Sequence, residues 1–293
     1  MTSSSELTIV STTDRSMTAQ ADSDAQVMKL WIRSSNSTHT RRARQEDARR
    51  FESFVGKPLT GISVGDIQAY IAELTGSDGT KARRINNLKS LLSFAHRIGY
   101  LPFNVGSVVK SVPVKETLSK RIITEADVHA LITLETNPRD KVMLTLLYAS
   151  GVRISEVVGL TWRDCTARDD AGQITVFGKG GKTRVVLLSK ATWKSLVALR
   201  GNAGTDDPVF WSRKGGALDT SAVHRVVKSA VERAGLDPAV SAHWLRHAHA
   251  SHALDRGAPI HLVQATLGHA SVATTGRYLH ARPSDSSSRY LAV

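Results

Sequence analysis

Apolar side chains recur every three or four positions through the first third of the chain, which is the spacing of amphipathic helices. Four segments between residues 26 and 111 follow this spacing. Gly56 is placed to end the second of them, and Ser63 to cap the third. The pattern predicts a small helical bundle.

The pattern changes in the rest of the chain. Helices are expected from Thr124 on, and Gly151 interrupts an apolar helix before the next one begins. Residues 173–188 contain two β-rich runs joined by a turn of Gly and Lys, which predicts a hairpin. Helices are expected again from residue 220. The predicted fold class is mainly α with a small β-sheet or hairpin.

Two stretches without helical periodicity divide the chain into domains. Residues 1–25 are rich in Ser, Thr and Asp and have few large apolar groups, so we expect a flexible tail. Residues 112–122 combine a proline with several charges, which predicts a linker. A helical domain at 26–111 and a second domain at 123–293, with a short C-terminal tail, are therefore expected.

The charge of the chain indicates the kind of partner. The formal net charge is +13, from 39 Lys and Arg against 26 Asp and Glu. Such an excess favours a polyanion, above all nucleic acid, because each neutralised phosphate releases counterions. Basic residues of the helical domain are therefore expected to contact DNA phosphates. These are Arg41, Arg42, Arg44, Lys81, Arg83, Arg84 and Lys89.

The composition also excludes several classes of protein. Cys165 is the single cysteine, so an intrachain disulfide and a cysteine metal cluster are both excluded. The chain has neither the long apolar run of a membrane span nor the pattern of a secretory signal. The histidines around residues 247–252 lack the carboxylate or cysteine that would complete a metal site. We expect a cytoplasmic, nucleoid-associated protein without a metal.

Five short motifs in the second domain carry groups that can act on a phosphodiester. That chemistry needs a nucleophile, cations and donors for the charge that develops on phosphorus, and an acid for the departing oxygen. Arg153 lies where a helix begins, and His243 and Arg246 share one helical face. The other candidates are Lys179 in the hairpin turn, with Lys182 and Arg184 as neighbouring alternatives, His269 and Tyr278.

In order and spacing, these motifs resemble those of the tyrosine recombinases, the phage-integrase and Xer-type enzymes. The matching segments are SGVRISE, GKG, HWLRH and LGHASVATTGRY, and the resemblance runs from about residue 26 to the end. It implies a two-domain architecture, with a helical SAM-like core-binding domain followed by an α+β catalytic domain. It also implies a supporting role for Glu156 and a catalytic role for Arg153, Lys179, His243, Arg246, His269 and Tyr278.

The resemblance implies a site-specific DNA recombinase. Tyr278 would form a 3′-phosphotyrosyl link, and strand exchange would pass through a Holliday junction without ATP, metal or other cofactor. The implied partners are double-stranded DNA with inverted-repeat half-sites, a homotetramer on that DNA or a related recombinase, and accessory proteins. The segment after Tyr278 is expected to dock in a neighbouring subunit. With only a short tail before residue 26, simple Xer-like or small integrase behaviour is expected.

Two other functions fit parts of the same pattern. A type IB topoisomerase shares the 3′-phosphotyrosine chemistry, and a non-catalytic DNA-binding protein can retain the same scaffold. Each residue alone also fits a structural role, such as a buried tyrosine for Tyr278 or a surface ion pair for Arg153. The occurrence of all the motifs in one order favours the recombinase.

Overall fold

Serine residues begin every α-helix of the first part of the chain, and Ser63 does so through a capping box with Asp66. The computed structural model describes residues 20–110, 118–178 and 181–281. Contacts divide the chain into two units, Met1–Lys115 and Glu116–Val293. The helices of the first unit are α1 (Asp24–Arg33), α2 (Thr38–Val55), η1 (Leu59–Gly61), α3 (Val64–Ala72), α4 (Asp78–Arg97) and η2 (Val105–Val108).

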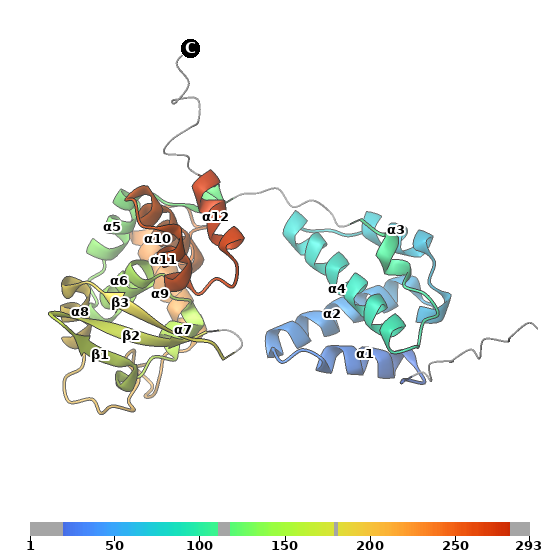
Figure 1. The fold of residues 1–293 in the computed structure, drawn as a ribbon, viewed down its shortest axis with the longest axis horizontal. Coiled ribbons are helices and arrows are strands. Elements are labelled where there is room, and N and C mark those ends of the chain that lie inside the picture. The colour runs from blue at the N-terminus through green and yellow to red at the C-terminus, as the bar shows by residue number, and fades with distance from the viewer. Residues whose placement is uncertain (1–19, 111–117, 179–180, 282–293) are drawn as a thin grey trace, which may run out of the picture. The chain divides into compact units, whose positions relative to one another are not determined.

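The first unit is a helical bundle (Figure 1). Its core consists of aromatic and aliphatic side chains. Phe51 and Ile85, from α2 and α4, are almost completely buried, and Phe51 meets Tyr70 of α3 edge-on at 5.0 Å between ring centroids. Gly56 ends α2 in the left-handed conformation. The prediction of a small helical bundle is confirmed.

The last residues of the expected tail at 1–25 belong to the folded first unit. Asp24 is already in α1, and its carboxylate accepts hydrogen bonds from the Tyr100 hydroxyl at 2.7 Å and the Leu59 amide at 2.9 Å. Ala21 is only 3% exposed. These contacts come from residues far along the chain, so the local composition gave no sign of them.

The second unit contains most of the helices and all three strands of the described chain (Figure 1). Its elements are η3 (Ser119–Arg121), α5 (Glu125–Thr133), α6 (Pro138–Ser150), α7 (Ile154–Val158), η4 (Trp162–Asp164), β1 (Cys165–Arg168), β2 (Ala171–Phe177), β3 (Thr183–Leu188), α8 (Lys190–Val197), α9 (Thr220–Arg233), α10 (Ala242–Asp255), α11 (Ile260–Leu267) and α12 (Val272–Ala281).

The sheet is antiparallel in the order β1-β2-β3. β2 and β3 form the predicted hairpin, with Ile174 opposite Val186 and Val176 opposite Arg184. Alternate residues of both strands are buried toward the helices. β1 is a third strand that the pattern did not predict, because three of its four residues are exposed and show no alternation.

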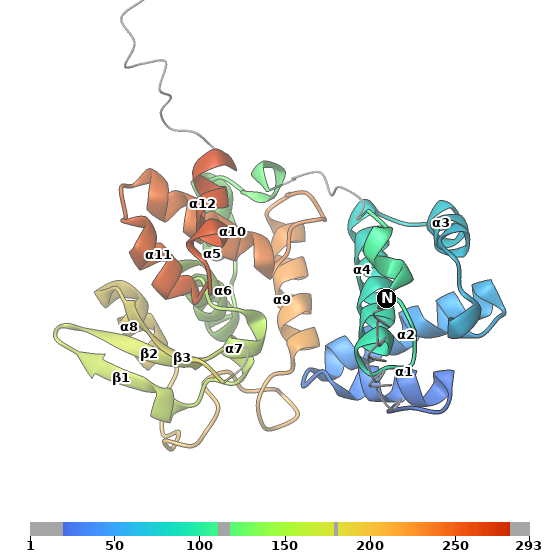
Figure 2. The same ribbon diagram turned by 45° about the vertical axis from the view of Figure 1, so that its right-hand side comes forward.

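The helices of the second unit pack around α6 and α10, which lie against each other (Figure 2). α6 is buried on several sides and ends at Gly151, whose φ of 59° lets the chain turn at once into α7. α11 and α12 pack on α10, so the ends of α6, α10 and α11 meet near the start of α7.

The second half of the expected linker at 112–122 belongs to the second unit. Leu118 and Ile122 are 7% and 5% exposed and pack with Tyr278, Val263 and other apolar side chains. Residues 111–117 lie outside the described part of the chain.

Candidate active site

Two arginines share one buried carboxylate at the start of α7. Glu156 accepts hydrogen bonds from the backbone N–H and the guanidinium of Arg153, at 2.8 and 2.9 Å. Arg184 of β3 binds both oxygens of the same carboxylate at 2.8 Å. Burial opposes ionisation, but the hydrogen bonds from Arg184 and Arg153 outweigh it and lower the pKa of Glu156 to about 2. The carboxylate is therefore charged and fixes both guanidinium groups.

Arg246 of α10 is buried in the middle of this region. Its guanidinium donates to the carbonyls of Gly151 and, at 2.6 Å, Leu267, and the residue is only 2% exposed. Burial and the charge of Arg153 lower the pKa of Arg246 to about 10, so it remains a cation at pH 7. One side chain thus joins three elements and brings its charge next to Arg153.

His269 follows α11 on a turn that only a glycine fits comfortably. Gly268 has φ of 65°, and a Cβ there would lie 3.1 Å from the Arg184 side chain. Nδ1 of His269 is 2.9 Å from the hydroxyl of buried Thr275, which links it to α12. Burial and the charges of Arg246 and Arg153 lower the pKa of His269 to about 4, so its ring is neutral at pH 7.

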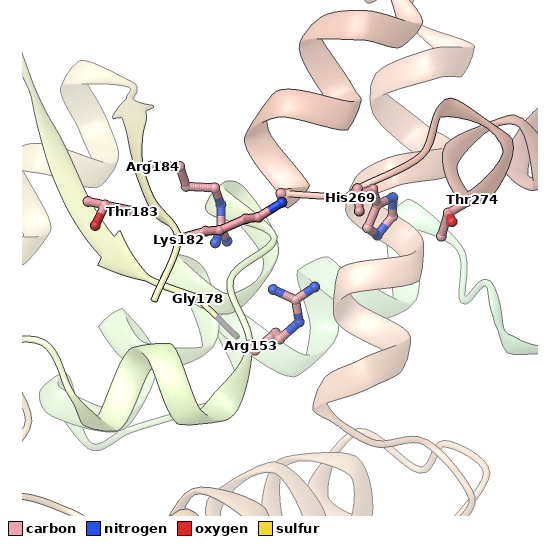
Figure 3. Close-up of a pocket in the computed structure, with 9 residues that line it drawn as sticks. Arg153, Gly178, Lys182, Thr183, Arg184, His269 and Thr274 are labelled. Carbon is pink, nitrogen blue, oxygen red and sulfur yellow. The ribbon is translucent and has the colours of Figure 1, made fainter. Parts of the chain in front are cut away.

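A cavity of about 640 Å³ opens between these groups. Figure 3 shows Arg153, Lys182 and His269 pointing toward one another across it. Cations line it, and the carboxylate of Glu156 is already bound by two arginines. Such a hollow favours an anion, and a phosphodiester is the anion that a basic chain meets on DNA. Its lining residues are Arg153, Gly178, Lys182, Thr183, Arg184, Gly268, His269, Ala270 and Thr274.

Tyr278 lies beside this cavity but is not part of its lining. It is 5% exposed and packs in an aliphatic cluster with Leu118 and Ile122. Its ring is parallel to that of His269 within 3°, with 6.5 Å between centroids. Its hydroxyl lies 2.8 Å from Nδ1 of His247. Burial raises the pKa of Tyr278, so the phenol carries its proton at pH 7.

His243 is exposed at the N-terminal end of α10, one turn before Arg246. Its ring meets that of His247 edge-on at 4.4 Å, and the Tyr278 hydroxyl is bonded to His247. Desolvation and the charge of Arg246 lower the pKa of His243, which favours the neutral ring. His243 and Arg246 do share one helical face, as their spacing indicated.

The structure thus gathers Arg153, Glu156, His243, Arg246, His269 and Tyr278 in one region of the second unit. Lys179 lies outside the described residues. Of its two neighbours, Arg184 is engaged with Glu156 and with the Thr266 carbonyl, whereas Lys182 faces the cavity. From the sequence, no catalytic role was assigned to His247, although its position four residues after His243 places it on the same face as that histidine.

The basic residues of the first unit fall into two groups. Five of the seven expected DNA contacts already bind protein atoms: Arg44 stacks on Trp31, Arg83 pairs with buried Asp47, and Arg41, Arg84 and Lys89 donate to backbone carbonyls. Within the described ranges, Arg42 and Lys81 make no such contact. These two keep their donors available for phosphates.

The remaining histidines of α10 and its surroundings have protein partners. Nδ1 of His249 donates to the Tyr148 carbonyl at 2.8 Å, and Nδ1 of His252 lies 3.0 Å from the Tyr148 hydroxyl. Among the residues that the structure describes, no three His, Cys, Asp or Glu side chains are placed to hold a metal ion. Nor is any helix in that part of the chain long and apolar enough to cross a membrane.

A basic cavity beside a tyrosine can hold an anion next to a phenol oxygen, and known proteins make the class specific. Residues 121–285 match the phage integrase family. The tyrosine recombinase XerC of Thermodesulfovibrio yellowstonii is 33% identical over 267 residues, covering 85% of this chain and 88% of that protein. XerD of Corynebacterium glutamicum is 32% identical over 243 residues, covering 76% and 79%. The chain belongs to the phage integrase family of tyrosine recombinases.

Solved structures share the fold. The XerH site-specific recombinase bound to difH substrate is 23% identical, with a TM-score of 0.69 over 88% of this chain and 81% of that chain. A lambda integrase (75–356) dimer bound to a COC′ core site is 17% identical, with a TM-score of 0.74 over 89% and 95%. The mainly helical fold with a small sheet is therefore shared with these recombinases.

Proposed function

We propose that this chain recombines DNA at a specific site with Tyr278 as its nucleophile. The observation that carries the proposal is the cavity lined by Arg153, Lys182, Arg184 and the neutral ring of His269, next to the phenol of Tyr278. Arg153 is held in place by Glu156, and Arg246 by two backbone carbonyls. Groups fixed in this way stabilise a developing charge without having to reorganise during the reaction.

The proposed first step transfers one phosphodiester bond to the protein. The phenol oxygen of Tyr278 attacks phosphorus, the bond to the 5′ oxygen breaks, and a 3′-phosphotyrosine forms. Arg153 and Arg246 hold the nonbridging oxygens, and His269 donates a hydrogen bond to them. His243 accepts the phenol proton, and Lys179 protonates the departing 5′ oxygen, which leaves as a hydroxyl.

The second step reverses the first with a different strand. The 5′-hydroxyl of a partner duplex attacks the phosphotyrosine, the new phosphodiester forms, and the phenol of Tyr278 recovers its proton. In each of the two steps, one ester bond to phosphorus breaks and another forms. Repetition on the second pair of strands passes through a Holliday junction, and no nucleotide hydrolysis is needed.

The proposed partners follow from this chemistry. Two half-sites in inverted repeat accommodate two protomers, and two such duplexes accommodate four copies of this chain or copies shared with a related recombinase. Accessory proteins and docking of the residues after Ala281 into a neighbouring subunit belong to the same proposal. Its place of action is the nucleoid in the cytoplasm, where the DNA substrate is found.

The first test selects DNA that becomes covalently attached to the protein. The protein is mixed with nicked duplexes that carry random half-sites, and DNA that remains attached after denaturation with detergent is recovered and sequenced. Enrichment of an inverted repeat is expected. Attachment without any sequence preference, together with relaxation of plasmids, would instead favour a topoisomerase; absence of attachment would favour a DNA-binding protein without catalysis.

On the selected duplex, Tyr278→Phe is expected to abolish the covalent adduct and to leave DNA binding within about twofold, because only the attacking oxygen is removed. Tyr148→Phe is the matched control, since Tyr148 also bonds a histidine of α10 through its hydroxyl. The control is expected to form the adduct. An adduct from the Tyr278 variant would mean that another residue attacks.

A further inference from the structure

His247 lies on the same face of α10 as two of the proposed catalytic residues. Arg246 and His247 follow His243 by three and four positions, so both lie beside it one turn further along the helix. His247 is buried, and its ring lies between those of His243 and Tyr278, at 4.4 and 5.7 Å between centroids. The helix that presents the phosphate-binding arginine therefore also reaches the nucleophile.

The contact between His247 and Tyr278 fixes the hydroxyl of a tyrosine whose ring packs in an aliphatic cluster. The aliphatic cluster around Tyr278 restrains the ring, and the hydrogen bond of 2.8 Å to Nδ1 fixes the hydroxyl. α12 is tied to the cavity a second time, one turn earlier, where Thr275 bonds His269. The hydrogen bond to His247 of α10 thus sets the direction of the phenol oxygen.

The surroundings of His247 define what its ring can do. It faces His243 and Arg246 on its own helix, Arg121 on η3, and Arg277 and Tyr278 on α12. Burial, followed by the charges of these basic neighbours, lowers its pKa to about 3. The ring is neutral at pH 7, and it accepts a hydrogen bond from the protonated phenol. Because the imidazolium is so disfavoured, this ring is suited to orient a hydroxyl and unsuited to store its proton.

We propose that His247 is a positioning residue for DNA cleavage: its hydrogen bond with Tyr278 aims the phenol oxygen at the phosphate that Arg153 and Arg246 hold. The inference rests on the proposed role of Tyr278 as nucleophile. Arg246 is close enough to Tyr278 for its charge to act on the phenol, so the phosphate-binding group and the aimed oxygen belong to one site. Orientation of this kind contributes to rate without any contact with substrate.

The test compares two substitutions of His247. His247→Leu removes the acceptor and keeps the apolar volume, whereas His247→Asn keeps an acceptor near the position of Nδ1. The single-turnover rate of covalent attachment to saturating nicked DNA is expected to fall roughly 10- to 100-fold in the Leu variant. The Asn variant is expected to stay within about threefold of the wild-type rate, and both variants to bind DNA as tightly as wild type.

A matched pair of controls is available one turn and a half further along α10. His252 bonds the hydroxyl of Tyr148 as His247 bonds that of Tyr278. His252→Leu and His252→Asn remove or keep an acceptor in the same helix, at a tyrosine with no proposed part in the reaction. Both are expected to attach to DNA at the wild-type rate, which separates a general effect of packing from the loss of orientation.

The pH dependence gives a further readout. If the ring of His247 only positions the phenol and stays neutral, the rate of covalent attachment depends on pH in the same way in wild type and in His247→Asn between pH 6 and 9. Equal rates for the Leu and Asn variants, a faster Leu variant, or an inflection that disappears in the Asn variant would each overturn the proposal. Failure of the nucleophile assignment would show separately, as adduct formation by Tyr278→Phe.

Discussion

At the scale of single residues, Glu156 shows how one buried charge can hold two arginines of a site in place. Its side chain is 1% exposed and receives hydrogen bonds from both Arg153 and Arg184. The sequence resemblance implied the first contact, through the supporting role expected of Glu156 beside Arg153. It could not predict the second, because β3 brings Arg184 from 28 positions away and nothing in the local pattern marks such a pair.

Glu156→Gln is expected to destabilise the second unit by on the order of 3 kcal/mol at pH 7, because two guanidinium groups lose their buried counter-charge. The pKa of Glu156 is lowered from 4.5 to about 2 in the folded protein, so its stabilising contribution is complete above about pH 4.5 and is lost as pH falls toward 2. Urea unfolding at pH 7 and pH 3 measures this difference.

The control for Glu156 is Glu125→Gln. Glu125 pairs with Arg256 at the surface, where both side chains are exposed. This variant is expected to change the free energy of unfolding by less than about 0.5 kcal/mol. A difference between wild type and Glu156→Gln that is as large at pH 3 as at pH 7 would contradict the electrostatic explanation.

At the scale of elements, the periodic segments were predictable, whereas the places where elements meet were not. Hydrophobic spacing indicated the four helices of the first unit, the hairpin, and the helices on either side of Gly151. Leu118 and Ile122 were assigned to a linker because the stretch around them contains a proline and several charges. Their burial comes from α10, α11 and α12, which lie far ahead in the chain.

Gly151 joins α6 to α7, and its replacement by Ala is expected to disturb both. Its φ of 59° disfavours a side chain, and a Cβ would lie 2.7 Å from Leu267 and 2.8 Å from His249. Gly257 also has positive φ, but no atom within 4 Å would meet its Cβ.

Gly257→Ala is therefore the control and is expected to cost about 1–2 kcal/mol from backbone strain alone. Gly151→Ala is expected to cost at least twice as much and to slow covalent attachment, because the Gly151 carbonyl also holds Arg246. Thermal unfolding and the attachment rate measure the two effects, and equal losses from both variants would argue against the steric account.

At the scale of the whole molecule, net positive charge indicated DNA but did not show which cations were available to bind it. Of the basic residues in the first unit, several maintain the bundle. Arg83 pairs with Asp47, which is 4% exposed and whose Oδ1 has no hydrogen-bond partner among the described residues. Charge counts alone cannot separate such a residue from Arg42, because both carry the same charge on neighbouring helices.

Arg83→Ala is expected to destabilise the first unit by about 2 kcal/mol, since it leaves a buried carboxylate with Asn87 as its remaining side-chain partner. Arg42→Ala is expected to leave stability unchanged and to reduce the slope of log K against log salt by about 0.9, one phosphate contact. Urea unfolding and DNA titrations at several salt concentrations measure these changes. The division of roles would be wrong if Arg42→Ala destabilised the bundle as much as Arg83→Ala.

The hydrogen bonds of Arg246 have a consequence for judging which relatives of this chain are active. Its guanidinium is bound to the carbonyls of Gly151 and Leu267, so the fold itself needs this arginine. A descendant that had lost recombination and kept only DNA binding would still be selected to retain it. Presence of this residue in a homologous chain is therefore a poor sign of activity. The Tyr278 hydroxyl is a better one, because phenylalanine can fill its aliphatic cluster equally well.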